Sequence, residues 1–92
     1  MILSYADSDT QLLRDGVKVH RFKQFERVAL RKLLLLEAAK NLEDLRIPPG
    51  NRLEALMGDR KGQYSIRINE KWRICFKWTF SGATNVEIVN YH

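Results

Sequence analysis

Apolar residues recur with the period of one helix face between residues 19 and 40. The repeating positions, spaced by three and four, are Phe22, Phe25, Ala29, Leu33, Leu36 and Ala39. This spacing predicts one continuous helix over residues 19–40 whose apolar stripe packs in the core. Leu30, Leu34 and Leu35 widen the apolar surface beyond that stripe. They either pack in the core as well or form a face for a partner helix or strand.

Shorter elements flank this helix. Residues 1–5 alternate weakly between apolar and polar, which predicts a short first strand. The run Asp7-Ser8-Asp9 predicts the cap of a brief helix that ends by Gly16. Asn41 can end the long helix, and residues 46–51 cannot continue it, because proline lacks a donor and restricts the residue before it.

After residue 51 the apolar period changes from helical to alternating. The candidate strands are residues 52–57, 63–69, 72–78 and 85–91, with turns at 58–62, 69–71 and 81–82. Strands joined by short turns predict an antiparallel meander. The order of strand, helices and strands predicts a single α+β domain over residues 1–92, with helices covering one face of the sheet and the other face accessible.

Composition limits the class of protein. The 92 residues are 45% apolar and 29% charged, which is typical of one folded domain with a modest core. A net charge of +5 favours a polyanion or an acidic protein as partner. The start of the chain lacks the pattern of a signal peptide, and the longest apolar run, Leu33 to Leu36, is too short to cross a bilayer. We therefore expect a cytoplasmic protein with no membrane partner.

Neither a cofactor nor a metal site is expected. The single Cys75 cannot form a disulfide within one chain, and its position in an alternating strand favours a buried structural thiol over a reactive one. His20 and His92 are far apart in the chain and no cysteine pair accompanies them, so there is no zinc signature, and His20 is expected at the surface. Trp72 and Trp78 share the alternation of the apolar strand positions, which favours core packing over base stacking.

Basic and imidazole groups gather on the last strands. Arg67 and Arg73 alternate with the apolar residues of their strands, and if they pair across the hairpin they lie close enough to share one phosphate. The terminal Tyr91-His92 adds a group that titrates near neutral pH. Cutting RNA without a metal needs cations around the phosphorane and a group that moves protons. The alternative interpretation is that the arginines are solvated strand residues and the terminal histidine is a frayed end.

Four segments together carry a family resemblance: IPPGNRLEAL (47–56), GDRKGQYSIRIN (58–69), WRICF (72–76) and VEIVNYH (86–92). They resemble HigB, the killer-protein branch of the RelE/ParE toxin superfamily, over the whole chain. The resemblance implies a RelE-like fold, with N-terminal helices packed on a mostly antiparallel sheet of four to five strands. It implies a type II toxin that cleaves messenger RNA in the ribosomal decoding site. The implied partners are a HigA-like helix-turn-helix antitoxin, the ribosome and mRNA, with operator DNA bound only through the antitoxin.

The resemblance also implies roles for single residues. Arg73 matches the family's strand arginine, which cradles the scissile phosphate, and Tyr91 and His92 match its terminal pair, which positions the nucleotide and transfers a proton. Arg67 and Asn69 lie where relatives carry a further RNA contact, and Arg67 is placed with the catalytic residues. Additional expected RNA contacts are Lys71, Lys77, Asn90 and Arg60.

The chain departs from the family pattern at three positions. Met57 stands where relatives frequently have Lys, and Asn90 where they frequently have Asp. A cation and a carboxylate that would orient an imidazole are therefore missing. Some relatives place a His near Glu54, and the carboxylate of Glu54 either substitutes as a base or is a solvated strand residue.

Two functional classes remain from the sequence. The first is a metal-independent, ribosome-dependent endoribonuclease. The second is a ParE-like toxin without enzymatic activity that inhibits DNA gyrase, and a simple RNA-binding module is a weaker third. The terminal Tyr91-His92 favours cleavage, because a pure binder needs no group that titrates near neutrality.

Overall fold

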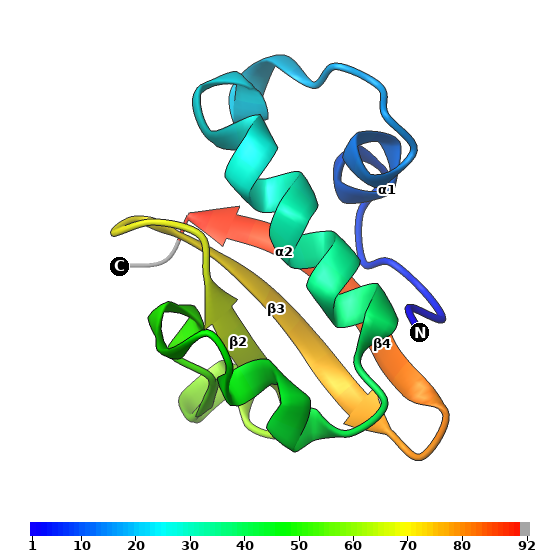
Figure 1. Cartoon of the computed structure of the whole chain (residues 1–92), viewed down its shortest axis with the longest axis vertical. Helices are drawn as coiled ribbons and strands as arrows, with labels where there is room; N and C mark the ends of the chain where they lie inside the picture. Colours follow the sequence, from blue (N-terminus) through cyan, green and yellow to red (C-terminus); the bar gives the residue numbers. More distant parts are fainter. Residues whose placement is uncertain (91–92) are drawn as a thin grey trace.

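The computed structural model describes residues 1–90, and Tyr91 and His92 lie outside the described residues. Within residues 1–90, two α-helices and four strands form an α+β fold, and short 3₁₀ helices lie in the connections (Figure 1). The elements in chain order are α1 (Ser8–Arg14), η1 (His20–Phe25), α2 (Glu26–Ala38), η2 (Leu42–Arg46), η3 (Pro49–Asn51), β1 (Glu54–Ala55), η4 (Gly58–Arg60), β2 (Tyr64–Arg67), β3 (Trp72–Thr79) and β4 (Gly82–Asn90).

The strands form one antiparallel sheet in the order β1-β2-β3-β4, which confirms the predicted meander. The turn between β2 and β3 is closed by Asn69, whose side-chain oxygen accepts the backbone N–H groups of Lys71 and Trp72 at 2.9 Å each. Asparagine favours turns because its side chain can bond the backbone two residues on. The turn fixes the register of the hairpin, so that Tyr64 lies opposite Phe76 and Arg67 opposite Arg73.

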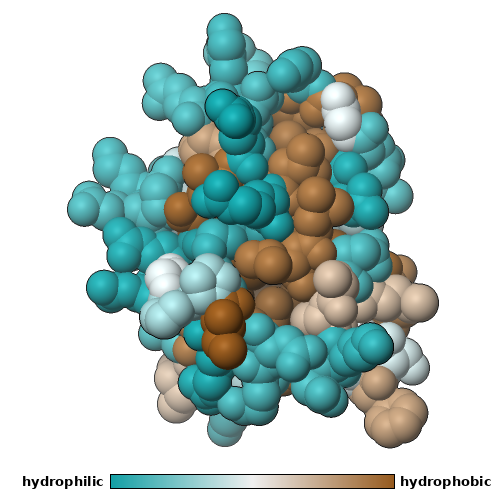
Figure 2. All heavy atoms as spheres, viewed as in Figure 1, coloured by the Kyte–Doolittle hydropathy of each residue, from teal (hydrophilic) through white to brown (hydrophobic). Residues whose placement is uncertain are grey.

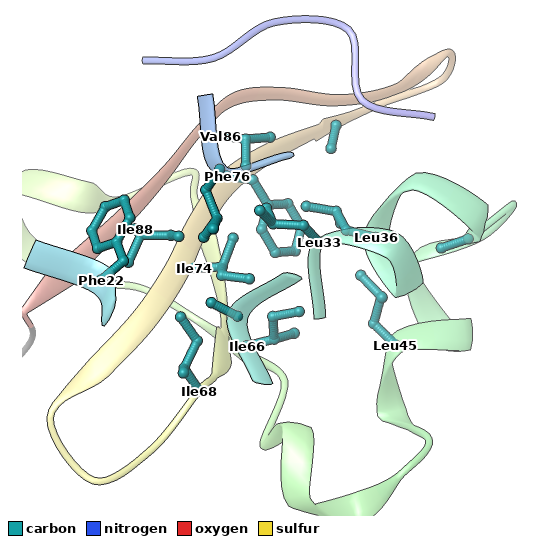
Figure 3. Close-up of a cluster of buried hydrophobic side chains, with 14 residues drawn as sticks. Phe22, Leu33, Leu36, Leu45, Ile66, Ile68, Ile74, Phe76, Val86 and Ile88 are labelled. Atoms are coloured by element: carbon teal, nitrogen blue, oxygen red, sulfur yellow. The ribbon is translucent and has the colours of Figure 1, made fainter. Parts of the chain in front are cut away.

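Helices α1 and α2 lie on one side of the sheet, and the core fills the space between the two layers (Figures 1 and 3). Every residue of the predicted helical stripe is buried or half-buried. These side chains meet alternate residues of β2, β3 and β4, which point to the same side of a pleated sheet. The largest fully buried apolar side chains are Phe22, Phe76, Leu33, Leu36, Leu45, Ile66, Ile74 and Val86. The predicted layer arrangement is therefore confirmed.

The prediction of one continuous helix over residues 19–40 is wrong at its start. Residues 20–25 form the 3₁₀ helix η1, and the α-helical hydrogen bonding of α2 begins only at Glu26. Side chains at positions i and i+3 eclipse in a 3₁₀ helix. This places the rings of Phe22 and Phe25 on the same indole, with centroids 6.0 and 4.9 Å from that of Trp72. Packing against the sheet thus overrides the helical period in this segment.

The first predicted strand is also only partly formed. Ile2 and Tyr5 make isolated parallel bridges with Ala83 and Val86 of β4, and no regular strand joins them. The interruption has a local cause. Asn85, between the two bridges, has a left-handed φ of 52°, and its N–H donates to the hydroxyl of Ser4 instead of continuing the ladder.

The predicted strand 52–57 shrinks to the two residues of β1. Arg52 adopts a left-handed φ of 46° and closes η3, so the chain becomes extended only after it. Gly58, with a φ of 64°, then begins η4. Asp7 occupies the predicted N-cap position of α1 but makes no side-chain cap hydrogen bond. Its carboxylate instead pairs with Arg21 at 3.0 Å and links α1 to η1.

Candidate functional site

Arg67 and Arg73 lie directly opposite each other on β2 and β3, so the two arginines do pair across the hairpin. Their neighbours Ile66 and Ile74 are fully buried under the helices. Side chains alternate between the two faces of a sheet, so the two arginines occupy the face away from the helices. Two guanidinium groups on directly opposed strand positions can reach one anionic group, and each presents several donors to it.

Arg73 is held in place by groups from two other strands. Its Nη1 lies 2.8 Å from Oε1 of Glu54 on β1 and donates to the hydroxyl of Ser65 on β2 at 3.2 Å. Only 17% of the arginine side chain is exposed, whereas half of the Glu54 side chain is exposed. Glu54 is therefore the ion-pair partner of Arg73 and, as one of the two interpretations from the sequence expected, an exposed strand residue; its role as a base stays a prediction.

A second ion pair lies further along the same face. Arg60 Nη1 is 2.9 Å from Oε1 of Glu87 on β4 and donates to the side-chain oxygen of Gln63 at 3.0 Å. The side chain of Arg60 is 32% exposed and that of Glu87 is 26% exposed. Arg60 was expected at a surface turn, and its contact with a strand 27 residues away could not be read from local pattern.

The thiol of Cys75 lies between these two ion pairs. In the sheet register Cys75 stands opposite Ser65 on one side and Glu87 on the other. The residue is fully buried, which confirms the predicted structural thiol. Burial raises the pKa of the Cys75 thiol, and the neighbouring arginines only partly oppose that effect. At neutral pH the group is a neutral thiol and therefore a poor nucleophile.

The other residues expected to contact RNA lie near the ends of the sheet. Lys71 is exposed in the β2–β3 turn, and Lys77 is exposed on β3. Asn69 is exposed, and its oxygen closes the turn. Asn90 ends β4 opposite Trp72, one position beyond the residue paired with Arg73. Tyr91 and His92 continue from Asn90 in the sequence and lie outside the described residues, so their predicted roles stay predictions.

The sequence did not predict a hollow of about 670 Å³ between η1 and the β2–β3 turn. It is lined by His20, Arg21, Lys23, Gln24, Phe25, Asn69, Glu70, Lys71 and Trp72. Trp72 is half-buried, with its ring against Phe25, so it belongs both to the margin of the core and to this hollow. His20 is exposed there, as expected.

No group of three or more His, Cys, Asp or Glu side chains within residues 1–90 is arranged to hold a metal ion. None of the helices in the described part is both long and apolar enough to span a bilayer, and α2 has 13 residues.

A small helix layer packed on an antiparallel meander is consistent with the class of RelE-like toxins. Residues 4–92 match the family described as the RelE-like toxin of the type II toxin-antitoxin system HigB. The chain belongs to this family, and membership implies an antitoxin as partner.

Two relatives extend the comparison. Toxin HigB-1 of Vibrio cholerae serotype O1 is 41% identical over 87 residues, which cover 92% of both chains. A protein of Haemophilus influenzae described as uncharacterized is 38% identical over 60 residues, which cover 65% of this chain and 59% of that protein. The chain is therefore a HigB-like toxin of a type II toxin-antitoxin pair.

Proposed function

We propose that this toxin is a ribosome-dependent endoribonuclease that cleaves mRNA in the ribosomal A site and thereby inhibits translation. The observation that carries the proposal is the pairing of Arg67 and Arg73 on the face of the sheet away from the helices. Membership of the HigB family supports the same reaction. The arginines supply fixed positive charge where a phosphate would be attacked, and charge aimed at a developing oxyanion is a large contribution to catalysis.

The proposed reaction is an attack of a ribose 2′-oxygen on the adjacent phosphorus. The 2′-hydroxyl loses its proton to a base, the bond from phosphorus to the 5′-oxygen breaks, and that oxygen gains a proton. The products are a 2′,3′-cyclic phosphate and a 5′-hydroxyl. No metal is required by this scheme, because a guanidinium pair can stabilise the extra charge of the phosphorane.

Arg73 has the better-defined role of the two arginines. Glu54 and Ser65 both contact Nη1 of its guanidinium. A cation held in advance stabilises the transition state without paying for reorganisation during the reaction. Arg67, directly opposite, is proposed to contact the same or the adjacent phosphate.

The proton carriers are proposed from the sequence. In the sequence Tyr91 and His92 directly follow Asn90, the last residue of β4. Histidine is the side chain that ordinarily titrates near neutral pH, and a tyrosine ring can stack on a base or take part in proton transfer. Asn69, Lys71, Lys77, Asn90 and Arg60 are proposed as contacts to mRNA or ribosomal RNA.

The partners follow from the same proposal. The toxin would act in the cytoplasm, where ribosomes present the mRNA. Its antitoxin would be HigA-like, with a helix-turn-helix domain through which the complex binds operator DNA. The net charge of +5 suits both an RNA substrate and an acidic partner surface.

Incorporation of radiolabelled precursors after induction of the toxin tests this function. We expect incorporation of amino acids to stop first, because the proposed target is the translating ribosome. A fall in DNA synthesis that precedes the fall in protein synthesis would instead identify gyrase as the target and would exclude the ribosomal proposal. The Arg73→Ala variant is the matched control, since it should leave both incorporations unchanged.

A further inference from the structure

An apolar patch lies on the helix layer, on the opposite side of the molecule from the paired arginines. The patch begins at the C-terminal cap of α1. The N–H of Val17 donates to the carbonyl of Leu12 at 2.9 Å, and the N–H of Gly16, with a φ of 89°, donates to that of Leu13 at 3.0 Å. This is the Schellman arrangement, which brings the side chains at the positions of Leu12 and Val17 together. Both remain exposed, at 40% and 46%.

Helix α2 continues the patch. A groove of about 120 Å³ lies between the end of α1 and the start of α2, and both Val17 and Leu30 line it. Leu34 lies one helical turn beyond Leu30 and is 45% exposed. Figure 2 shows apolar atoms gathered in a band over this helical side of the molecule. We name Leu12, Val17, Leu30 and Leu34 the helix patch. The sequence left open whether Leu34 packs in the core. Its exposure shows that Leu34 is not a core residue.

Isolated exposed leucines are ordinary, but apolar side chains gathered around a groove mark an interaction surface. The groove is far smaller than the roughly 300–1,000 Å³ of pockets that hold small-molecule ligands. It suits one inserted side chain. Such a filled pocket, ringed by weaker contacts, is the usual anatomy of a protein–protein hot spot.

Charge around the patch selects the kind of partner. Arg27 and Arg31 are exposed on α2, three residues before Leu30 and Leu34 respectively. Lys18 lines the groove, with its amine 2.9 Å from Glu26. Glu26 also lines the groove and offsets the charge of Lys18, so the net positive charge of the rim comes from Arg27 and Arg31. A second copy of this chain would bring like charges together, whereas an acidic amphipathic segment would pair with them.

We propose that the helix patch is a docking surface for the antitoxin, which contributes a segment of apolar side chains flanked by Asp or Glu. One apolar side chain of that segment fills the groove between Val17 and Leu30, and its neighbours cover Leu12 and Leu34. The carboxylates of the segment meet Arg27 and Arg31. The inference rests on the antitoxin partner that the family implies and does not depend on which reaction the toxin performs.

Binding of the full toxin to the protein encoded by the reading frame adjoining its own, measured by calorimetry without ribosomes or RNA, tests this inference. Leu34→Glu and Val17→Glu should each weaken binding at least tenfold, because a buried carboxylate would replace a central apolar contact. Phe80→Glu is the matched control. Phe80 is fully exposed in the β3–β4 turn, outside the patch, so its substitution should change affinity less than twofold.

A second pair of variants tests the basic rim. The double variant Arg27→Glu, Arg31→Glu should weaken binding and make it less dependent on salt. The control variant Lys40→Glu, Lys61→Glu makes the same change in net charge outside the patch, and it should change neither the affinity nor its salt dependence. Thermal unfolding confirms that each variant is folded.

Three results would overturn the inference. The first is binding unchanged by both patch variants, or weakened equally by Phe80→Glu. The second is a dimer that the toxin forms on its own in analytical sedimentation and that the Leu34→Glu substitution dissociates. The patch would then bind a second copy of the toxin. The third is that no protein encoded beside the toxin binds the parent chain. Since no cleavage is measured, these results stand apart from the success or failure of the proposed nuclease activity.

Discussion

The carboxylate of Glu54 lies 2.8 Å from the guanidinium of Arg73, across the strand that separates β1 from β3. Half of the Glu54 side chain is exposed, so a phosphate that approaches Arg73 meets this carboxylate as well. The geometry favours a positioning role, because one carboxylate oxygen, Oε1, is engaged with the arginine.

We therefore expect Glu54→Gln to lower the rate of mRNA cleavage by less than about tenfold. Glutamine keeps an oxygen that can accept from Arg73, and Ser65 still holds the same nitrogen. A general base typically contributes about 10²–10⁴-fold. Single-turnover cleavage at several pH values distinguishes the roles, since a loss in that larger range together with a changed pH profile would make Glu54 the base.

Arg73→Ala should abolish toxicity while the protein stays folded. Removing a preorganised donor from an oxyanion site costs roughly 10²–10³ in rate. The change also removes one partly exposed ion pair, which is typically worth about 0–1 kcal/mol. Growth after induction measures the toxicity, and thermal unfolding of the same variant shows whether it is folded. Toxicity equal to that of the parent, with unchanged unfolding, would remove Arg73 from the site.

Cys75 should resist thiol reagents in the native protein. The side chain is fully buried and its pKa is raised by burial, so little thiolate forms and no reagent reaches it. It is the only cysteine, so labelling by a chromogenic disulfide reports this one position. We expect reaction only after addition of denaturant. Fast labelling of the folded chain at neutral pH would contradict the buried thiol.

The raised pKa of Cys75 also determines how the stability of the protein depends on pH. At pH values just above the ordinary thiol pKa, the unfolded state has lost the thiol proton, whereas the folded state still holds it. The contribution of Cys75 to stability is therefore complete below that pKa and declines as the pH rises through the raised value. A Cys75→Ser control should lose this alkaline dependence.

Gly82→Ala should destabilise the protein, whereas Gly50→Ala should not. Gly82 has a φ of 141°, and a Cβ there would lie 2.3 Å from the carbonyl oxygen of Met1. A Cβ at Gly50 meets nothing within 4 Å. Overpacking costs typically about 1–3 kcal/mol, and for a domain of this size each kcal/mol lowers Tm by roughly 4–8 °C. Calorimetric Tm values that agree between the two variants would show that the first residues are not held against β4.

The sequence predicted those parts of the fold that depend on local pattern. The opposition of Arg67 and Arg73 followed from strand alternation and a turn closed by Asn69, both of which are local. The break between η1 and α2 could not be predicted from local pattern, because it depends on the packing of Phe22 and Phe25 on Trp72, about fifty residues away.

The ion pairs of the site were missed for the same reason. Glu54 and Arg73 belong to strands that are not sequence neighbours, and Arg60 reaches Glu87 from a short 3₁₀ helix. Period and turn signals give the register of two strands joined by a short turn, but they do not show which side chains meet between elements that no turn connects. The end of the chain was assigned from family resemblance, and Tyr91 and His92 lie outside the described residues.

The most direct test of RNA cleavage on the ribosome uses the last residue. Programmed ribosomes carrying a defined mRNA are incubated with the parent toxin or with His92→Gln, and the 5′ ends of the mRNA fragments are mapped while binding to the ribosome is measured in parallel. Glutamine can donate and accept hydrogen bonds but cannot titrate, so it separates proton transfer from contact. We predict cleavage in the A site by the parent, and bound but uncut mRNA with His92→Gln. Absence of cleavage by the parent, or equal cleavage by the variant, would contradict this account.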